Sequence, residues 1–146
     1  MLFKICIHNI IGIKQELVRL PFVDSMAFTN DHIVAISYVC CQLEYLIKMA
    51  LFDFEGNLVR EVKELPTGDV IDAPTAVAVD NQDNIWLSDA LLGKIIVFDT
   101  DGNYVGEVED IGSPEKIIFY DEKVFTLTEK CEEESCETFV TIYTIT

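Results

Sequence analysis

Few residues of this chain have the types and the spacing that catalysis requires. The two histidines, His8 and His32, are far apart in the sequence, and each lies beside a predicted strand end, which indicates a plain polar surface role. No HExxH helix, phosphate-binding glycine loop, nucleophile elbow or dinucleotide fingerprint is present. Motifs alone therefore predict no catalytic residue and no metal ligand.

Cysteine is the other residue type that could carry chemistry, and the chain has five: Cys6, Cys40, Cys41, Cys131 and Cys136. An odd number without an export signal makes reduced thiols the default. Within the segment CEEESC, however, the two end cysteines would meet in a disulfide if the segment is a tight hairpin. A zinc site joining them to the Cys40–Cys41 pair is a further alternative, although neither pair has C-x2-C spacing. The adjacent glutamates disfavour thiolate and hence a reactive nucleophile.

The charge of the chain narrows the class of partner. Ten basic residues against 26 acidic ones give a formal charge of -16, which repels phosphate backbones and attracts basic protein surfaces. We therefore expect no direct nucleic-acid binding, and a basic protein surface is the favoured partner. Residues 1–20 have neither a secretory apolar core nor enough apolar residues for a spanning helix, so we expect no membrane contact and a cytoplasmic location by default.

A repeat of about 45 residues dominates the sequence. Three segments align on their glycines: KICIHNIIGIKQELVRL from Lys4, KMALFDFEGNLVREVKEL from Lys48 and KIIVFDTDGNYVGEVEDI from Lys94. The glycines, Gly12, Gly56 and Gly102, are spaced by 44 and 46 residues. Each segment is typical of a strand, a tight turn and a second strand, with a glycine free to adopt positive φ in the turn. Four short strands per period is the length of a β-propeller blade.

A second strand pair precedes each complete hairpin. Its best copy runs from Ala73 to Asp89, with strands Ala76–Val79 and Ile85–Leu87 around a polar turn. Weaker copies place strands at Met26–Phe28 and Ile33–Ile36, and at Ile117–Tyr120 and Val124–Leu127. Apolar residues at consecutive positions in such strands predict sheets that are covered on both faces. The sequence thus predicts one all-β repeat domain, made of a strand pair (1–20), two blades (21–65 and 66–111) and an incomplete blade (112–146).

Within this repeat, Pro74 to Val108 resembles an NHL repeat, the unit of a class of six-bladed propellers. The matching features are the proline, the strand that ends in Asp80, the Asn84-Ile85-Trp86 start of the next strand, and Asp101-Gly102 in the last turn. Asp83 departs from the pattern, since a glycine commonly precedes the asparagine. A hairpin solenoid and a β-sandwich are the alternatives to the propeller.

The resemblance implies two kinds of function. Propellers without catalytic motifs usually act as scaffolds or protein-interaction modules, which is the function we expect. Gluconolactonase-like propellers hold a divalent metal with acidic and amide side chains, and residues of suitable type here are Asp24, Asn30, Asp80 and Asn84. A metal-dependent hydrolase or lyase is therefore an alternative, with a divalent cation where we otherwise expect no cofactor. The acidity of the chain, rather than the resemblance, gives a third possible function: an inhibitor that mimics nucleic acid.

Counting strands predicts an open ring. The strand pair, two blades and incomplete blade give little more than three blades, whereas a propeller closes with at least four. An open arc exposes apolar blade faces and an unpaired edge at Phe139–Thr146. We therefore expect a homodimer that closes about six blades, with a strand near Ile13–Leu20 of one chain completing the last blade of the other; a larger assembly is the alternative. The strand Phe3–His8 has no assigned place in that arrangement.

Two insertions are the candidate partner-binding loops. SYVCCQLEYLIK, Ser37 to Lys48, and EKCEEESCET, Glu129 to Thr138, occupy the same connection in two blades and should emerge on the same side of the ring. The first is aromatic and apolar, and the second is strongly acidic, a pairing that favours a basic or amphipathic protein partner. The alternative is a solvated loop and an ordinary lengthened hairpin. The residues we expect to contact a partner are Tyr38, Tyr45, Leu46, Glu132, Glu133 and Glu134.

Overall fold

The chain folds into antiparallel β-sheets. The computed structural model describes the backbone of residues 3–8, 14–20, 23–41, 44–109, 111–132 and 135–144, and within these ranges it contains thirteen strands and no helix. Side chains are described for residues 25–36, 48–109, 111–129, 131 and 135–144. A helix of the length and apolarity that would cross a membrane is accordingly not found among the described residues.

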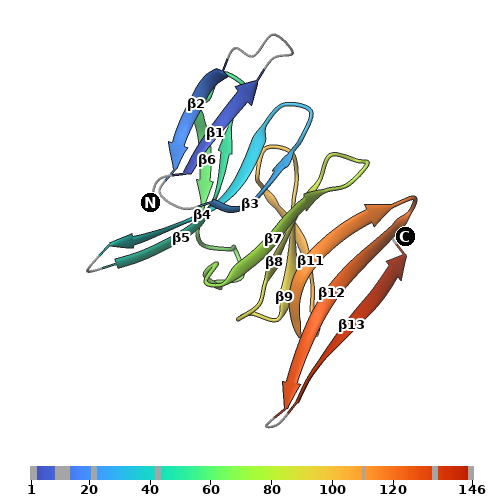
Figure 1. Ribbon diagram of the computed structural model, residues 1–146. Coiled ribbons are helices and arrows are strands. Elements are labelled where there is room, and N and C mark those ends of the chain that lie inside the picture. The colour runs from blue at the N-terminus through green and yellow to red at the C-terminus, as the bar shows by residue number, and fades with distance from the viewer. Residues whose placement is uncertain are drawn as a thin grey trace.

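The thirteen strands divide into a hairpin and three blades (Figure 1). The N-terminal hairpin pairs β1 (Phe3–His8) with β2 (Lys14–Leu20). The first blade contains β3 (Val23–Phe28), β4 (Ile33–Cys41), β5 (Glu44–Phe52) and β6 (Leu58–Val62). The second contains β7 (Pro74–Val79), β8 (Ile85–Asp89), β9 (Lys94–Phe98) and β10 (Tyr104–Val108). The third contains β11 (Ser113–Tyr120), β12 (Lys123–Glu132) and β13 (Ser135–Thr144).

Each blade is a simple meander, in which every strand pairs with the next along the chain. The three innermost strands share a register shift near their start, between Val23 and Ser25, between Pro74 and Ala76, and between Pro114 and Lys116. The repeat read from the sequence is therefore also a repeat in backbone geometry. The sheets contain two, four, four and three strands in chain order.

Apolar side chains fill the spaces between successive blades. One buried cluster joins the first and second blades and includes Val34, Ile36, Leu51, Ile85 and Phe98. A second cluster joins the second and third blades through Ile95, Ile111, Ile117 and Val124. Because each sheet of the first and second blades buries residues on both faces, the consecutive apolar residues 33–36 of β4, 49–52 of β5 and 95–96 of β9 are all covered.

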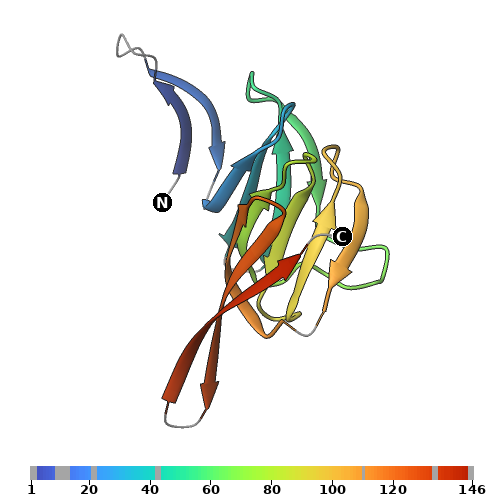
Figure 2. The ribbon, with the colours of Figure 1, turned by 90° about the vertical axis from the view of Figure 1, so that its right-hand side faces the viewer.

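The same expectation is wrong for β11. Ile117 is buried, but Ile118 and Tyr120 are exposed, because no further sheet of the described residues covers the outer face of the third blade. The N-terminal hairpin, by contrast, lies beside the first blade in both views (Figures 1 and 2). The two ends of the series of blades are therefore in different environments.

The turns lie at two opposite edges of the blades. In Figure 1 the turns after β3, β7 and β11 lie at the upper right, and those after β4, β8 and β12 lie at the lower left. We call these the turn edge and the hairpin edge. At the hairpin edge β4–β5 and β12–β13 continue as paired strands well beyond the short β8–β9 hairpin, whose last pair is Asp89 with Lys94. The segments read as inserted loops are thus mainly strand.

Candidate functional site

Three turns at the turn edge, those that follow β5, β7 and β9, share one hydrogen-bonded design. Asp53, Asp80 and Asp99 each accept a bond from the side-chain amide of the asparagine four residues later, at 2.8, 3.0 and 2.8 Å. Each also accepts from the backbone N–H groups two and four residues ahead. An aspartate that bonds its own following backbone is a turn former, so these carboxylates organise the chain locally.

The fourth residue of each of these turns has positive φ. Gly56 and Gly102 adopt 89° and 78°, and Asp83 adopts 70° at the equivalent place. Glycine takes this conformation without steric cost, whereas a residue with a Cβ is strained there. The departure from the NHL pattern at Asp83 is therefore a real structural exception, and a specific contact accompanies it.

Asp83 connects the turns of two blades. Its carboxylate accepts from the backbone N–H of Asn30 in the first blade at 2.9 and 3.1 Å, and from Thr100 Oγ1 at 3.1 Å. The half-buried His32 lies beside it, with Nδ1 at 2.9 Å from the Thr100 carbonyl oxygen. His32 therefore takes part in a contact between blades, a role that its isolated position in the sequence does not reveal.

Among the four residues that the sequence suggested as metal ligands, Asp80 is the strongest candidate, but its carboxylate already accepts four hydrogen bonds. It accepts from Gln82 N at 2.9 Å, Asn84 N at 2.9 Å, Asn84 Nδ2 at 3.0 Å and Trp86 Nε1 at 2.8 Å. A carboxylate offers about four lone-pair positions. No position remains for a cation, and Asn84 is held by the same contact. Asn30 lies in the neighbouring turn, and the side chain of Asp24 is outside the described residues.

The exposed copies of this turn have altered acidity. The side-chain amide of Asn57, with the nearby backbone N–H groups, lowers the pKa of Asp53 below its usual 3.8. At Asp99 partial burial raises the pKa, but the side-chain and backbone donors of Asn103 outweigh it, and the net pKa is lowered. Both carboxylates therefore stay ionised at neutral pH, and neither is a general acid.

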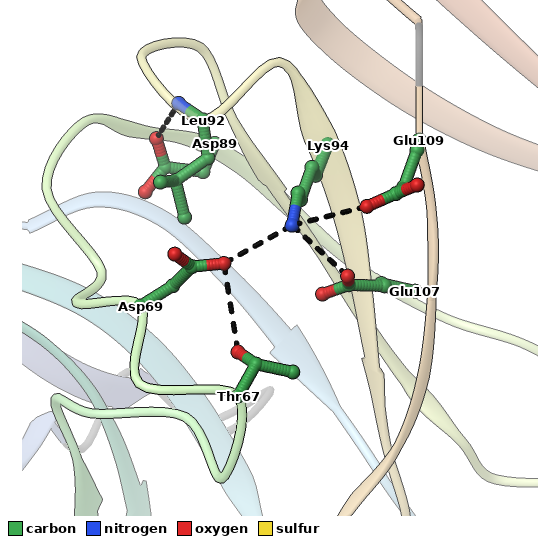
Figure 3. Close-up of polar contacts among 7 residues, drawn as sticks. All are labelled: Thr67, Asp69, Asp89, Leu92, Lys94, Glu107 and Glu109. Atoms are coloured by element: carbon green, nitrogen blue, oxygen red, sulfur yellow. Dashed lines mark hydrogen bonds and ion pairs between the residues drawn. The ribbon is translucent and has the colours of Figure 1, made fainter.

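A cluster of charges lies near the hairpin edge of the second blade (Figure 3). Lys94 Nζ is 2.9 Å from Glu107, 3.0 Å from Asp69 and 3.3 Å from Glu109. The hydrogen bond with Glu107, followed by that with Asp69, raises the pKa of Lys94. The lysine is therefore protonated throughout the physiological range, which excludes a role as a neutral amine nucleophile.

Asp89 stabilises the backbone beside this cluster. It is fully buried, and its carboxylate accepts from four backbone N–H groups, those of Asp72, Ala73, Leu91 and Leu92, at 2.9 to 3.2 Å. These bonds fix both the connection from the first blade and the β8–β9 turn. The polar groups of this cluster are thus occupied in joining blades, and the arrangement has no free nucleophile among the residues drawn in Figure 3.

The β12–β13 hairpin contains a disulfide. Cys131 and Cys136 are directly opposite in the ladder and form a disulfide. Glu129 lies close to both sulfur atoms, but a disulfide offers no thiolate to a metal. At the base of the hairpin is an open hollow of about 480 Å³, which is lined by residues of the second-to-third blade connection and of β12 and β13, among them Ile111, Thr128, Glu129, Phe139 and Thr141.

Four of the six residues expected to contact a partner lie at the hairpin edge. In the β4–β5 ladder Tyr38 is opposite Ile47, Leu46 opposite Val39, and Tyr45 opposite Cys40. In the other hairpin Glu132 is opposite Ser135. Glu133, Glu134 and Gly12 lie outside the described residues. Neither hairpin brings histidine, serine and carboxylate side chains together in the part of the chain whose side chains are described.

Sequence comparison leaves this site unassigned, since neither protein-family profiles nor curated protein sequences match the chain. Solved structures do resemble it. Virginiamycin B lyase from Staphylococcus aureus has a TM-score of 0.63 at 14% identity, over 97% of this chain and 48% of its own. BamB from Moraxella catarrhalis has a TM-score of 0.61 at 11% identity, over 90% of this chain and 34% of its own. A gluconolactonase from Xanthomonas campestris has a TM-score of 0.52 at 19% identity, over 77% of this chain and 37% of its own.

These matches establish the fold. The similar structures are β-propellers, and the chain spans about a third to a half of their length. The chain is therefore a partial β-propeller, as its repeat predicts. Because both enzymes and non-enzymes share the fold, the comparison leaves the activity undetermined.

Proposed function

We propose that the chain is a noncatalytic protein-interaction module that binds partners through the two long hairpins at the hairpin edge. The observation that carries this proposal is their length. The β4–β5 ladder continues to the pair Cys41 and Glu44, and the β12–β13 ladder continues to Glu132 and Ser135, whereas the intervening β8–β9 hairpin ends at Asp89 and Lys94. Paired strands that project from a rigid blade are a preorganised binding surface.

The composition of the two hairpins indicates the kind of partner. The first tip contains tyrosines and leucines, and the second contains four glutamates between Glu129 and Glu134. In a chain with a formal charge of -16, such a pair of tips favours a protein surface that is basic and has an apolar anchor point.

The turn contacts support a noncatalytic role. A metal-dependent hydrolase or lyase needs carboxylates that are free to bind the ion, and the saturated carboxylate of Asp80 does not meet that need. The carboxylate oxygens of Asp83 and Asp89 likewise accept hydrogen bonds from backbone N–H groups or a hydroxyl. These bonds join the blades.

A second copy of the chain is the partner we propose for completing the ring. The strand expected near residues 13–20 is β2, and among the described strands it pairs only with β1. Strand β13 likewise pairs only with β12 among the described strands. The free edge of β2 in one chain can therefore extend the third blade of another without breaking the β1–β2 ladder. A larger assembly is the alternative source of the missing strand.

Photo-crosslinking tests the interaction role. A photoreactive residue at Leu46 or at Glu132 should capture the same partner in cells of the source organism. The matched control is a photoreactive residue at Asn103 on the turn edge, which should not capture it. Replacing residues 39–46 by a two-residue turn, while keeping the blade, should abolish capture at Glu132 by weakening the shared interface. Equal capture at Asn103, or none at either tip, would contradict the proposal.

A further inference from the structure

The innermost strands of the three blades form a series with one repeated contact. Strand β7 contacts β3 on one side and β11 on the other. By the ladder register, Ala27, Ala78 and Ile118 are equivalent, since each lies two residues after the first pair that follows the register shift of its strand. Ala27 packs into the cluster of the first and second blades, and Ala78 into the next one. Ile118 is 59% exposed.

The rest of the outer face of the third blade follows the same rule. Phe125 lies between Ile118 and Ile142, and Leu127 is opposite Val140. The equivalent residues of the first blade are Val34, Leu51, Ile36 and Met49, and all four are fully buried against the second blade. In the third blade Val140 and Ile142 are 66% and 57% exposed. This apolar face, named here the outer face, therefore has the pattern of a surface against which another blade packs.

A complementary row is exposed at the other end of the series. Met26 and Phe28 of β3 point away from the second blade and are 49% and 53% exposed. Their equivalents in the second and third blades, Val77 and Ile117 for Met26, are covered by the preceding blade. The row of Met26 and Phe28 is thus where the innermost strand of a preceding blade would lie.

The remainder of that side of the first blade is already covered. Ile33, Ala35, Ala50 and Phe52 are buried, and the N-terminal hairpin lies beside this blade in both views (Figures 1 and 2). Only the part next to the innermost strand is open. A preceding blade that contributes its inner strands, and takes an outer strand from the hairpin, would cover it.

We propose that the outer face of one chain packs on the Met26–Phe28 row of a second copy of this chain, so that β11 of one copy continues the β3–β7–β11 series into β3 of the other. The proposal rests on the self-association proposed above and assigns its surfaces.

The two surfaces differ from each other, so the contact is head to tail. Head-to-tail contacts close into a ring when the rotation between copies completes a circle, and otherwise they produce open filaments. Three blades per chain, in a class that commonly closes with about six, predicts closure by two copies. Each dimer then contains two equal contacts between an outer face and a Met26–Phe28 row.

Light scattering after gel filtration of the 146-residue chain tests the assignment. The wild type should have twice the 16.5 kDa chain mass at micromolar concentration. Ile118→Asp and Met26→Asp, on the two surfaces, should each give the monomer mass. The matched control is Val105→Asp on β10, which replaces an equally exposed apolar residue outside both surfaces and should remain dimeric. Fluorescence of Trp86 checks that every variant is folded.

Mixing the two defective variants makes the test specific. Ile118→Asp retains an intact Met26–Phe28 row, and Met26→Asp retains an intact outer face. A mixture should recover part of the dimer through one intact contact, whereas a dimer made of two identical patches would not recover. A monomeric wild type overturns the proposal, as do filaments. A dimer that is insensitive to both variants overturns the surface assignment alone, and the crosslinking at the hairpin tips is unaffected by any of these results.

Discussion

Replacing Asp80 by alanine should destabilise the chain far more than the same change at Asp53, although the two turns have the same hydrogen-bond design. Asp80 is 9% exposed, and its removal leaves the indole N–H of Trp86 and the backbone N–H of Asn84 without their acceptor. A donor left unsatisfied in a buried place costs about 1 to 3 kcal/mol. Of the four donors to Asp80, water can reach the backbone of Gln82, which is exposed, and the side-chain amide of Asn84, which is half-buried and can turn, so we count the remaining two.

The expected loss for Asp80→Ala is therefore about 3 kcal/mol, which corresponds to a decrease in Tm of about 10 °C for a domain of this size. Asp53 is in a solvated turn, so water replaces its carboxylate and the change should be small. Asp80→Asn keeps one acceptor oxygen and should lie between the wild type and Asp80→Ala.

Urea denaturation followed by tryptophan fluorescence measures these differences directly, because Trp86 is the single tryptophan and bonds to Asp80. Its emission should also shift to longer wavelength in Asp80→Ala before unfolding, since the indole loses its partner. Equal losses for Asp80→Ala and Asp53→Ala would refute the reasoning, because they would show that the turn geometry, and not burial of the donors, sets the energy.

Three further predictions concern other parts of the fold. Gly102→Ala should lower the free energy of unfolding by about 1 to 2 kcal/mol, because φ is 78° and the new Cβ would lie 3.3 Å from the Arg60 side chain. Gly106→Ala, with open space around it, should be nearly neutral in the same denaturation assay. Ionised Asp99 stabilises the fold above its unfolded pKa of 3.8, and this contribution is lost as pH falls through the lower folded pKa. The difference in unfolding free energy between wild type and Asp99→Asn should therefore shrink below pH 3.8. A difference that grew instead would contradict the direction of the pKa shift. Reducing the Cys131–Cys136 disulfide should accelerate hydrogen exchange at the tip of β12–β13 and leave exchange in the second blade unchanged. If mass spectrometry of the chain purified without reductant shows no disulfide, the structure is contradicted.

The repeat made the fold predictable, because turn chemistry is local. Asp53 and Asp99 with the glycines three residues later identify the hairpin turns from sequence, and the strands expected around Asp80–Asn84 agree with β7 and β8 to within two residues at each end. Strand ends were less predictable at the hairpin edge. Cross-strand pairing carries β4 on to Cys41, a consequence of two segments meeting that neither segment indicates alone.

Contacts between blades were not predictable from the sequence. The bridge from Asp83 to Asn30 joins residues 53 positions apart, and the Lys94 cluster combines Asp69 of the β6–β7 connection with Glu107 of β10. One signal was present: an aspartate at a position where the repeat commonly has glycine. A residue that accepts backbone strain needs a compensating contact, and Asp83 has one.

The outer face of the third blade shows why burial cannot be read from residue type in a repeat. Ile95 and Val140 occupy equivalent positions and have similar side chains, yet one is fully buried and the other is two-thirds exposed. Strand β6 faces water at residues 58–61, and two of these four exposed residues, Arg60 and Glu61, are charged. The third blade keeps Ile118, Phe125, Leu127, Val140 and Ile142 together on one face instead. Exposed apolar surface of that kind costs solubility unless a partner covers it, and its agreement with the covered face of the first blade indicates that the partner is another blade.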